Sequence, residues 1–236
     1  MSTHPALRVL RSLVRVYTRV AAWYWGIIVA IVVVLVAAFG VLDEVRISGW
    51  SSVTTSAVKY WILSIGVMMP TVHLRFFVAN GITRRHFTLG AGLFGIVFVT
   101  SFSLIGLLGH AVEHPVYAAA GWLAQLDEPY LVGSVADGAL YLARAIPLHL
   151  VHFVAGALIG TGFYRFGVWR GIALIPPFAA LIVLAEVGFG SEWNPSLTDG
   201  PVPFAVASLG ALALAALAGL AARTLLATVP LNRTTA

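Results

Sequence analysis

Six long apolar runs constrain this chain more than any other feature of its sequence. Each is long enough to cross about 30 Å of hydrocarbon as a helix that rises about 1.5 Å per residue. The chain is 60% hydrophobic and only 10% charged, whereas soluble domains carry about 25% charged residues. Surplus apolar surface must therefore face lipid, which predicts an all-α, polytopic membrane protein with six transmembrane helices. The predicted spans are Trp23–Leu42, Ala57–Leu74, Thr88–Gly109, Ala139–Phe163, Gly171–Gly190 and Val202–Ala222.

The arginines predict the orientation of these spans. Six spans place eleven of the fourteen basic residues on one side of the membrane, and positive charge marks the cytoplasmic side. Both termini are therefore predicted to be cytoplasmic. The eleven are Arg8, Arg11, Arg15, Arg19, Arg75, Arg84, Arg85, Arg165, Arg170, Arg223 and Arg233. Of the other three, Arg46 lies in a loop, and Lys59 and Arg144 lie inside or at the edge of spans, where a long side chain can reach the headgroups.

The segment before the first span predicts a basic amphipathic helix over residues 1–22. One face carries Arg8, Arg11, Arg15 and Arg19, and the opposite face carries Leu7, Leu10, Val14 and Tyr17. Such a helix is expected to lie in the cytoplasmic interface, where anionic lipid attracts the arginines. A binding site for a specific partner is the alternative.

The remaining organisation is simple. Residues 23–224 form the predicted transmembrane domain, and 225–236 form a short cytoplasmic tail. The longest outer connection, 110–138, contains an apolar run of eleven residues, VYAAAGWLAQL, which is too short to span. We expect an interfacial or re-entrant helix there that ends at the turn of Asp127, Glu128 and Pro129. The absence of cysteine excludes disulfides and thiolate metal sites.

Among the ionisable residues inside predicted spans, four are candidates for a functional site: Arg144, His149, His152 and Glu186. Such groups cost about 2.5–3.5 kcal/mol each on insertion scales, so each should face another helix or a wet cavity. Two interpretations stay open. They line a substrate cavity or proton relay, or they are structural, with Arg144 paired to Glu186.

A second polar string, His110-Ala-Val-Glu113-His114, matches the inverted zinc-protease pattern. The alternative is a polar helix end, because Pro115 follows at once and no third ligand is evident. Nucleic acid is not an expected partner despite the net charge of +5, since the basic residues flank apolar runs.

The link between the second and third spans is the most informative segment. An apolar stretch leads to the chain-reversing pair Asn80-Gly81, followed by Thr83 as a helix cap and by two arginines. This link resembles the segment before the third span in permease subunits of ABC-2 type transporters. In that family the region includes the coupling helix that docks on the ATPase. The residues placed in it here are Phe76, Phe77, Asn80, Gly81, Ile82, Thr83, Arg84 and Arg85.

The resemblance extends to an N-terminal elbow helix, six spans and two cytoplasmic ends. One departure is that the family's re-entrant element precedes the last span, whereas the longer outer loop here precedes the fourth. The chain has no G-x-x-x-x-G-K-[ST] phosphate loop, so it is expected to have no ATPase activity and no cofactor of its own. The resemblance implies separate ATPase subunits that carry ATP and Mg²⁺, and a second permease chain as a homo- or heterodimer.

We therefore expect a permease subunit of an ABC exporter in the cytoplasmic (inner) membrane, with bacterial origin implied by the family. It would move a hydrophobic or amphipathic substrate outward by alternating access. The alternatives are a proton-coupled secondary transporter using His149, His152 and Glu186, a membrane metalloprotease using residues 110–114, and a membrane scaffold.

Overall fold

A computed structural model describes residues 4–42, 45–190 and 197–228 of the chain. The described residues are helical with connecting loops, and they contain no strand. The α-helices are α1 (Pro5–Leu42), α2 (Gly49–Met68), α3 (Leu74–Ala79), α4 (Arg84–Ala119), α5 (Val135–Ala173), α6 (Ile175–Gly188) and α7 (Phe204–Ala227). A π-helix, Met69–His73, joins α2 to α3, and a short 3₁₀ helix covers Trp122–Ala124.

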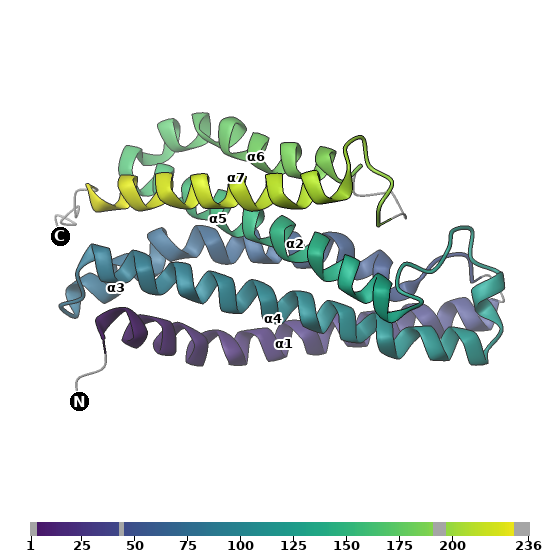
Figure 1. Cartoon of the computed structure of the whole chain (residues 1–236). Helices are drawn as coiled ribbons and strands as arrows, with labels where there is room; N and C mark the ends of the chain where they lie inside the picture. The colour runs from purple at the N-terminus through teal and green to yellow at the C-terminus, as the bar shows by residue number, and fades with distance from the viewer. Residues whose placement is uncertain (1–3, 43–44, 191–196, 229–236) are drawn as a thin grey trace.

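The long helices lie side by side and alternate in direction, so the bundle has two distinct ends (Figure 1). One end holds the start of α1, the helix α3, the start of α4 and the end of α7. We name it the arginine-rich end, because Arg8, Arg75, Arg84, Arg165 and Arg223 lie toward it in these elements. The opposite end holds residues 45–48 and 120–134, and we name it the cavity end.

Within the part of the chain that the structure describes, five helical segments are long and apolar enough to cross a membrane: Pro5–Leu42, Gly49–Ala79, Arg84–Ala119, Val135–Ala173 and Phe204–Ala227. The predicted fifth span, 171–190, corresponds to the shorter α6 of 14 residues. At about 1.5 Å per residue, α6 measures about 21 Å and falls short of the hydrocarbon thickness. The predicted all-helical fold is therefore confirmed, with five helical segments of spanning length and composition among the described residues, and six crossings stay a prediction.

The N-terminal segment and the first span form one continuous helix, α1, of 38 residues. The boundary predicted between residues 22 and 23 is not a break. The buried stripe of its first half also differs from the predicted apolar face: it is Ala6, Val9, Leu13 and Tyr17, while Leu7 and Val14 are exposed. This stripe packs on α4, where Tyr17 lies 5.1 Å from Phe94 between ring centroids.

The third span continues further than expected. Helix α4 runs through Pro115 to Ala119, so Val116–Ala119 extend this helix. The separate interfacial or re-entrant helix predicted in this connection is wrong. After Gly121, which has a φ of 74°, only the 3₁₀ turn Trp122–Ala124 precedes the loop to α5. A proline inside a helix is tolerated where neighbouring groups take over the lost hydrogen bond.

Helices α2 and α5 form the closest seam of the bundle. Gly66 of α2 faces the backbone of α5 at Phe153, and Gly156 and Gly160 of α5 face the backbone of α2 at Leu63 and Val67. A side chain at any of these glycines would collide with main-chain atoms, which is the reason for small residues at such contacts. Toward the cavity end the two helices contribute larger and polar side chains, and the space between them becomes a cavity.

Candidate functional site

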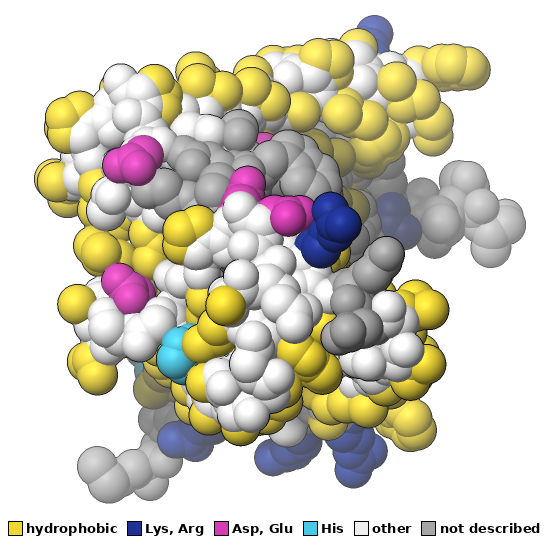
Figure 2. Space-filling model, turned by 90° about the vertical axis from the view of Figure 1, so that its right-hand side faces the viewer, with side chains coloured by type: hydrophobic (Ala, Val, Ile, Leu, Met, Phe, Trp, Pro, Cys, Tyr) yellow, Lys and Arg dark blue, Asp and Glu magenta, His cyan; other side chains and the backbone are white. Residues whose placement is uncertain are grey.

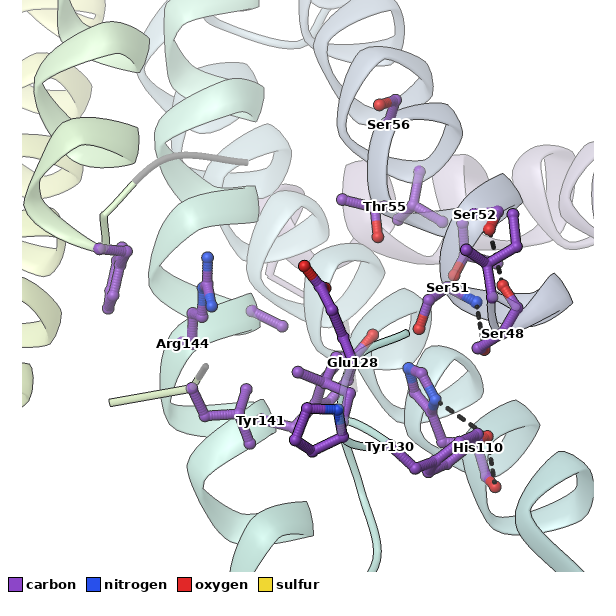
Figure 3. Close-up of a pocket in the computed structure, with 18 of the residues that line it drawn as sticks. Ser48, Ser51, Ser52, Thr55, Ser56, His110, Glu128, Tyr130, Tyr141 and Arg144 are labelled. Atoms are coloured by element: carbon purple, nitrogen blue, oxygen red, sulfur yellow. Dashed lines mark hydrogen bonds between the residues drawn. The ribbon is translucent and has the colours of Figure 1, made fainter. Parts of the chain in front are cut away.

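A cavity of about 600 Å³ lies between α2, α5 and α6 at the cavity end. Its volume falls in the range of small-molecule sites, about 300–1,000 Å³. The loop of Leu126–Leu131 forms one rim, and residues 46–48 form another. Figure 3 shows the polar side chains that α2, α5 and these loops direct toward this space.

One wall is a hydroxyl-bearing face of α2. Ser51, Ser52, Thr55 and Ser56 recur at helical spacing along it and all line the cavity, with Lys59 one turn deeper. Ser52 and Thr55 are exposed to the cavity side of the helix. A hydrophobic scan finds the long apolar part of this helix and passes over these hydroxyls, because they are only weakly polar.

The opposite wall comes from α5 and α6. On α5 the cavity-lining residues are each three or four positions from another of the set, so they share one face: Tyr141, Arg144, Ala145, Leu148 and His149. Phe189, just after α6, completes the wall, and the Arg144 guanidinium lies over its ring at 5.7 Å from the centroid. The cavity is thus lined by both apolar and charged groups.

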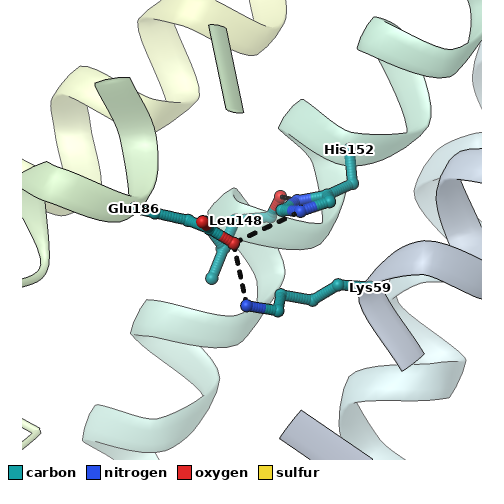
Figure 4. A network of polar contacts seen from close by, with 4 residues as sticks. All are labelled: Lys59, Leu148, His152 and Glu186. Atoms are coloured by element: carbon teal, nitrogen blue, oxygen red, sulfur yellow. Dashed lines mark hydrogen bonds and ion pairs between the residues drawn. The ribbon is translucent and has the colours of Figure 1, made fainter. Parts of the chain in front are cut away.

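The base of the cavity holds a buried ionic cluster (Figure 4). Lys59 Nζ lies 2.8 Å from Glu186 Oε1, and His152 Nε2 lies 3.5 Å from the same oxygen. Only 3% of the Lys59 side chain is exposed, so the prediction that Lys59 sits at a span end and reaches the headgroups is wrong. It lies ten residues inside α2 and forms an ion pair within the bundle.

The cluster also revises the structural pairing that the sequence suggested. Glu186 forms an ion pair with Lys59 of α2, and the predicted partner, Arg144 of α5, is attracted to the same carboxylate. His149 and His152, one helical turn apart, diverge: His149 Nδ1 lies 2.9 Å from the Ser103 hydroxyl of α4, and His152 faces α6. The structure therefore brings His152 and Glu186 together and sets His149 and Arg144 beside them on the cavity wall.

Glu113, the acid of the protease-like string, holds the cavity end together. Its carboxylate accepts hydrogen bonds from Ser48 Oγ at 2.5 Å, from the Trp50 backbone N–H at 2.8 Å and from the Tyr130 hydroxyl at 2.8 Å. Burial raises the pKa of Tyr130, and the neighbouring Glu113 charge raises it further, so this phenol stays a neutral donor. Among the described residues, no group of three His, Asp or Glu could hold a metal ion.

The cavity end is acidic at its surface. Asp127 and Glu128 are exposed in the rim loop, and both line the cavity. Figure 2 looks onto this end: acidic side chains lie among the loops, and hydrophobic side chains form most of the perimeter. That distribution fits an end that leaves the membrane while its sides stay in lipid.

The segment predicted to couple to an ATPase lies at the arginine-rich end. Phe77 and Ile82 are buried and anchor it, whereas Phe76 is 59% exposed. Gly81 has a φ of 79°, a left-handed conformation that favours glycine. The Thr83 hydroxyl accepts a hydrogen bond from the His86 N–H at 3.3 Å and caps α4. The turn and the cap that the sequence predicted are therefore present, and their docking role stays a prediction.

The two arginines of this segment differ in their surroundings. Arg85 is exposed. Arg84 Nη1 donates to the Ala227 carbonyl at 3.3 Å, which joins the start of α4 to the last turn of α7. The arginines of α1 predicted for the interface, Arg8, Arg11, Arg15 and Arg19, are all exposed on the face turned away from α4.

Comparison with known proteins leaves the site to be interpreted from its own chemistry. No family model, no curated protein and no solved structure matches this chain.

Sequence reasoning missed two parts of the site. The hydroxyl face of α2 was not predicted, because the predicted span starts at Ala57 and leaves out the first eight residues of this helix, Gly49–Ser56. A helical-wheel count from Ser48 to Lys59 would have revealed it. The pairing of Lys59 with Glu186 joins residues 127 positions apart, and no local signal in one sequence predicts such a contact.

Proposed function

We propose that this chain is the membrane-spanning permease subunit of an ATP-driven ABC exporter. A separate ATPase subunit binds ATP and Mg²⁺, and a second permease chain completes the pathway. The arginine-rich end faces the cytoplasm with both termini, and the cavity end faces outward. The cargo is a hydrophobic or amphipathic molecule, in keeping with a cavity whose walls combine apolar, hydroxyl and charged side chains.

The observation that carries this proposal is the shape of the loop at the arginine-rich end. A short helix, α3, presents exposed Phe76, the chain reverses at Gly81, and Thr83 starts α4 beside exposed Arg85. The buried anchors Phe77 and Ile82 hold this loop on the bundle. A small, fixed projection with an aromatic and a cationic group is suited to dock on an acidic, grooved partner.

The proposal is tested by isolating the tagged full chain from its native membrane in mild detergent. We expect a P-loop ATPase to accompany it and to hydrolyse ATP in the assembled complex. Arg85→Glu should reduce the bound ATPase by about tenfold, because a charge reversal at an interface costs about 1.4 kcal/mol or more. Arg170→Glu is the matched control, since it makes the same charge change at an exposed position of the same end.

Two outcomes would overturn the coupling assignment. In the first, no P-loop ATPase accompanies the wild-type chain. In the second, the Arg85→Glu and Arg170→Glu variants retain the ATPase equally well. Insertion of both variants into the membrane is checked by their yield in the membrane fraction, where the remaining arginines keep the orientation.

A second candidate is a proton-coupled secondary transporter. It is favoured by the buried cluster of Lys59, His152 and Glu186 beneath the cavity, since intramembrane ionisable groups mark ion pathways in many transporters. Transport assays in proteoliposomes distinguish the ABC permease from the secondary transporter. Uptake that requires ATP and the partner supports the ABC permease, and uptake that follows an imposed pH gradient without ATP supports the secondary transporter.

A further inference from the structure

The hydrogen bonds of His152 fix where one of its protons lies. The ring is fully buried, and its Nδ1 lies 2.8 Å from the carbonyl oxygen of Leu148. A carbonyl oxygen only accepts hydrogen bonds, so Nδ1 carries a proton and donates it. A neutral His152 would therefore have a bare lone pair on Nε2.

That second nitrogen faces a carboxylate. His152 Nε2 lies 3.5 Å from Glu186 Oε1, and no hydrogen bond from another group satisfies it within the described residues (Figure 4). Two acceptors facing one another in a buried site repel, whereas a proton on Nε2 turns the contact into an ion pair. We propose that His152 and Glu186 form a proton-binding site at the base of the cavity, in which His152 is held as an imidazolium.

The other charged groups around this site include some that oppose a positive charge on His152 and one that favours it. The titratable and charged groups that face it come from three elements: Lys59 and Tyr60 of α2, Arg144 and His149 of α5, and Glu186 of α6. From α4, the Ser103 hydroxyl contacts His149, and α7 contributes alanines to the packing of α5. Lys59 and Arg144 oppose a further positive charge, and Glu186 favours it.

The exposure of the cluster indicates how a proton reaches it. The Glu186 side chain is 18% exposed and lines the cavity, while His152 is fully buried behind it. A proton from cavity water therefore reaches the Glu186 carboxylate first and passes to His152 Nε2. The site loads from the cavity end of the bundle, and this holds whether ATP or a proton gradient supplies the energy for transport.

The test uses the full chain in lipid nanodiscs with isotope-labelled histidine side chains. Nuclear magnetic resonance distinguishes rings with one proton from rings with two, and the signal of His152 is identified by its loss in His152→Asn. At one mildly acidic pH, Glu186→Gln should lower the ratio of doubly to singly protonated His152 by about tenfold or more. Lys59→Met should raise that ratio, because it removes a positive neighbour.

Opposite changes in these two variants are the expected signature, and a cluster in which His152 stays neutral would not produce them. Glu128→Gln is the matched control, since it removes an acid that lines the same cavity and should leave the ratio unchanged. Should Lys59→Met fail to fold, the comparison of Glu186→Gln with Glu186→Asp tests the proposal instead. The aspartate keeps a carboxylate, so it should lower the ratio of doubly to singly protonated His152 less than the glutamine does. The proposal is overturned if His152 stays singly protonated at every pH at which the protein is folded. An equal ratio in Glu186→Gln and wild type has the same consequence.

Discussion

Arg84, the first residue of α4, donates a hydrogen bond to the carbonyl of Ala227, the last residue of α7, at 3.3 Å. Arg165 Nη1 acts on the same helix end, with contacts of 3.1 Å to the Leu225 carbonyl and 2.7 Å to the Thr228 hydroxyl. The last carbonyls of a helix have no partner within the helix and carry its negative dipole end. Two cations, one from the start of α4 and one from α5, therefore hold the end of α7.

This contact predicts different effects for the two neighbouring arginines. Arg84→Gln should weaken the hold on α7 and speed amide hydrogen exchange over residues 222–228, while Arg85→Gln should not. Because the contact is solvent-accessible, its loss should cost only about 0.5–1 kcal/mol. Hydrogen exchange by mass spectrometry in nanodiscs compares the two variants. Equal protection of this segment in both would show that the Arg84 contact does not restrain α7.

The fold was predictable as far as it depends on local composition. Runs of apolar residues located the spans, and Asn80, Gly81 and Thr83 located a turn and a helix start, because hydropathy and backbone preference act over a few residues. The ends of the helices were predicted less accurately, and α4 continues through Pro115 beyond its predicted end. Packing against residues 47–50 and Tyr130 stabilises that last stretch, and the sequence does not reveal this contact.

The site was predictable in its composition and not in its pairing. Ionisable residues in apolar spans pointed to His152 and Glu186, because their insertion cost requires a partner. Which partner each takes depends on how α2, α5 and α6 pack, and the glycines at Gly66 and Gly156 set that packing. The apolar face predicted for the first half of α1 was inaccurate for the same reason, since packing on α4 buries Val9 and Leu13 and leaves the predicted Leu7 and Val14 exposed.

The buried ion pair predicts strong coupling between Lys59 and Glu186. Lys59→Met or Glu186→Gln alone leaves a poorly compensated charge and should destabilise the protein by about 3 kcal/mol. The double variant should recover much of that loss. The matched cycle with Arg144→Gln and Glu186→Gln should show a smaller coupling energy. Unfolding in detergent measures both cycles, and additive effects of Lys59→Met and Glu186→Gln would contradict the ion pair.

The seam between α2 and α5 predicts that its glycines resist even small substitutions. Gly156→Ala places a methyl group against the backbone of α2 at Leu63, which cannot rotate away as a side chain can. Overpacking of this kind costs about 1–3 kcal/mol. Gly219→Ala in α7 is the control, because its added methyl group meets nothing within 4 Å. Similar melting temperatures for both variants would show that α2 and α5 are further apart than described.

The orientation and the number of crossings predict a labelling pattern. The chain has no native cysteine, so single cysteines can be introduced without a background signal. Ala79→Cys and Trp169→Cys lie at exposed positions of the arginine-rich end, and both should react with an impermeant reagent only from the cytoplasm. Glu128→Cys and Val135→Cys, exposed at the cavity end, should react only from outside.

The decisive position is Asp199, which lies between α6 and α7. Helix α6 measures only about 21 Å, so six crossings require that the chain after Gly188 continues to the far side before α7 returns. In that case Asp199→Cys reacts from the same side as Glu128→Cys. If α6 instead turned back within the membrane, Asp199→Cys would react from the side of Trp169→Cys, and α7 would end on the side opposite the start of α1. The Arg84 contact with Ala227 requires the end of α7 and the start of α4 to share a side. The start of α1 lies at that same end of the bundle (Figure 1), so we expect the six-crossing result.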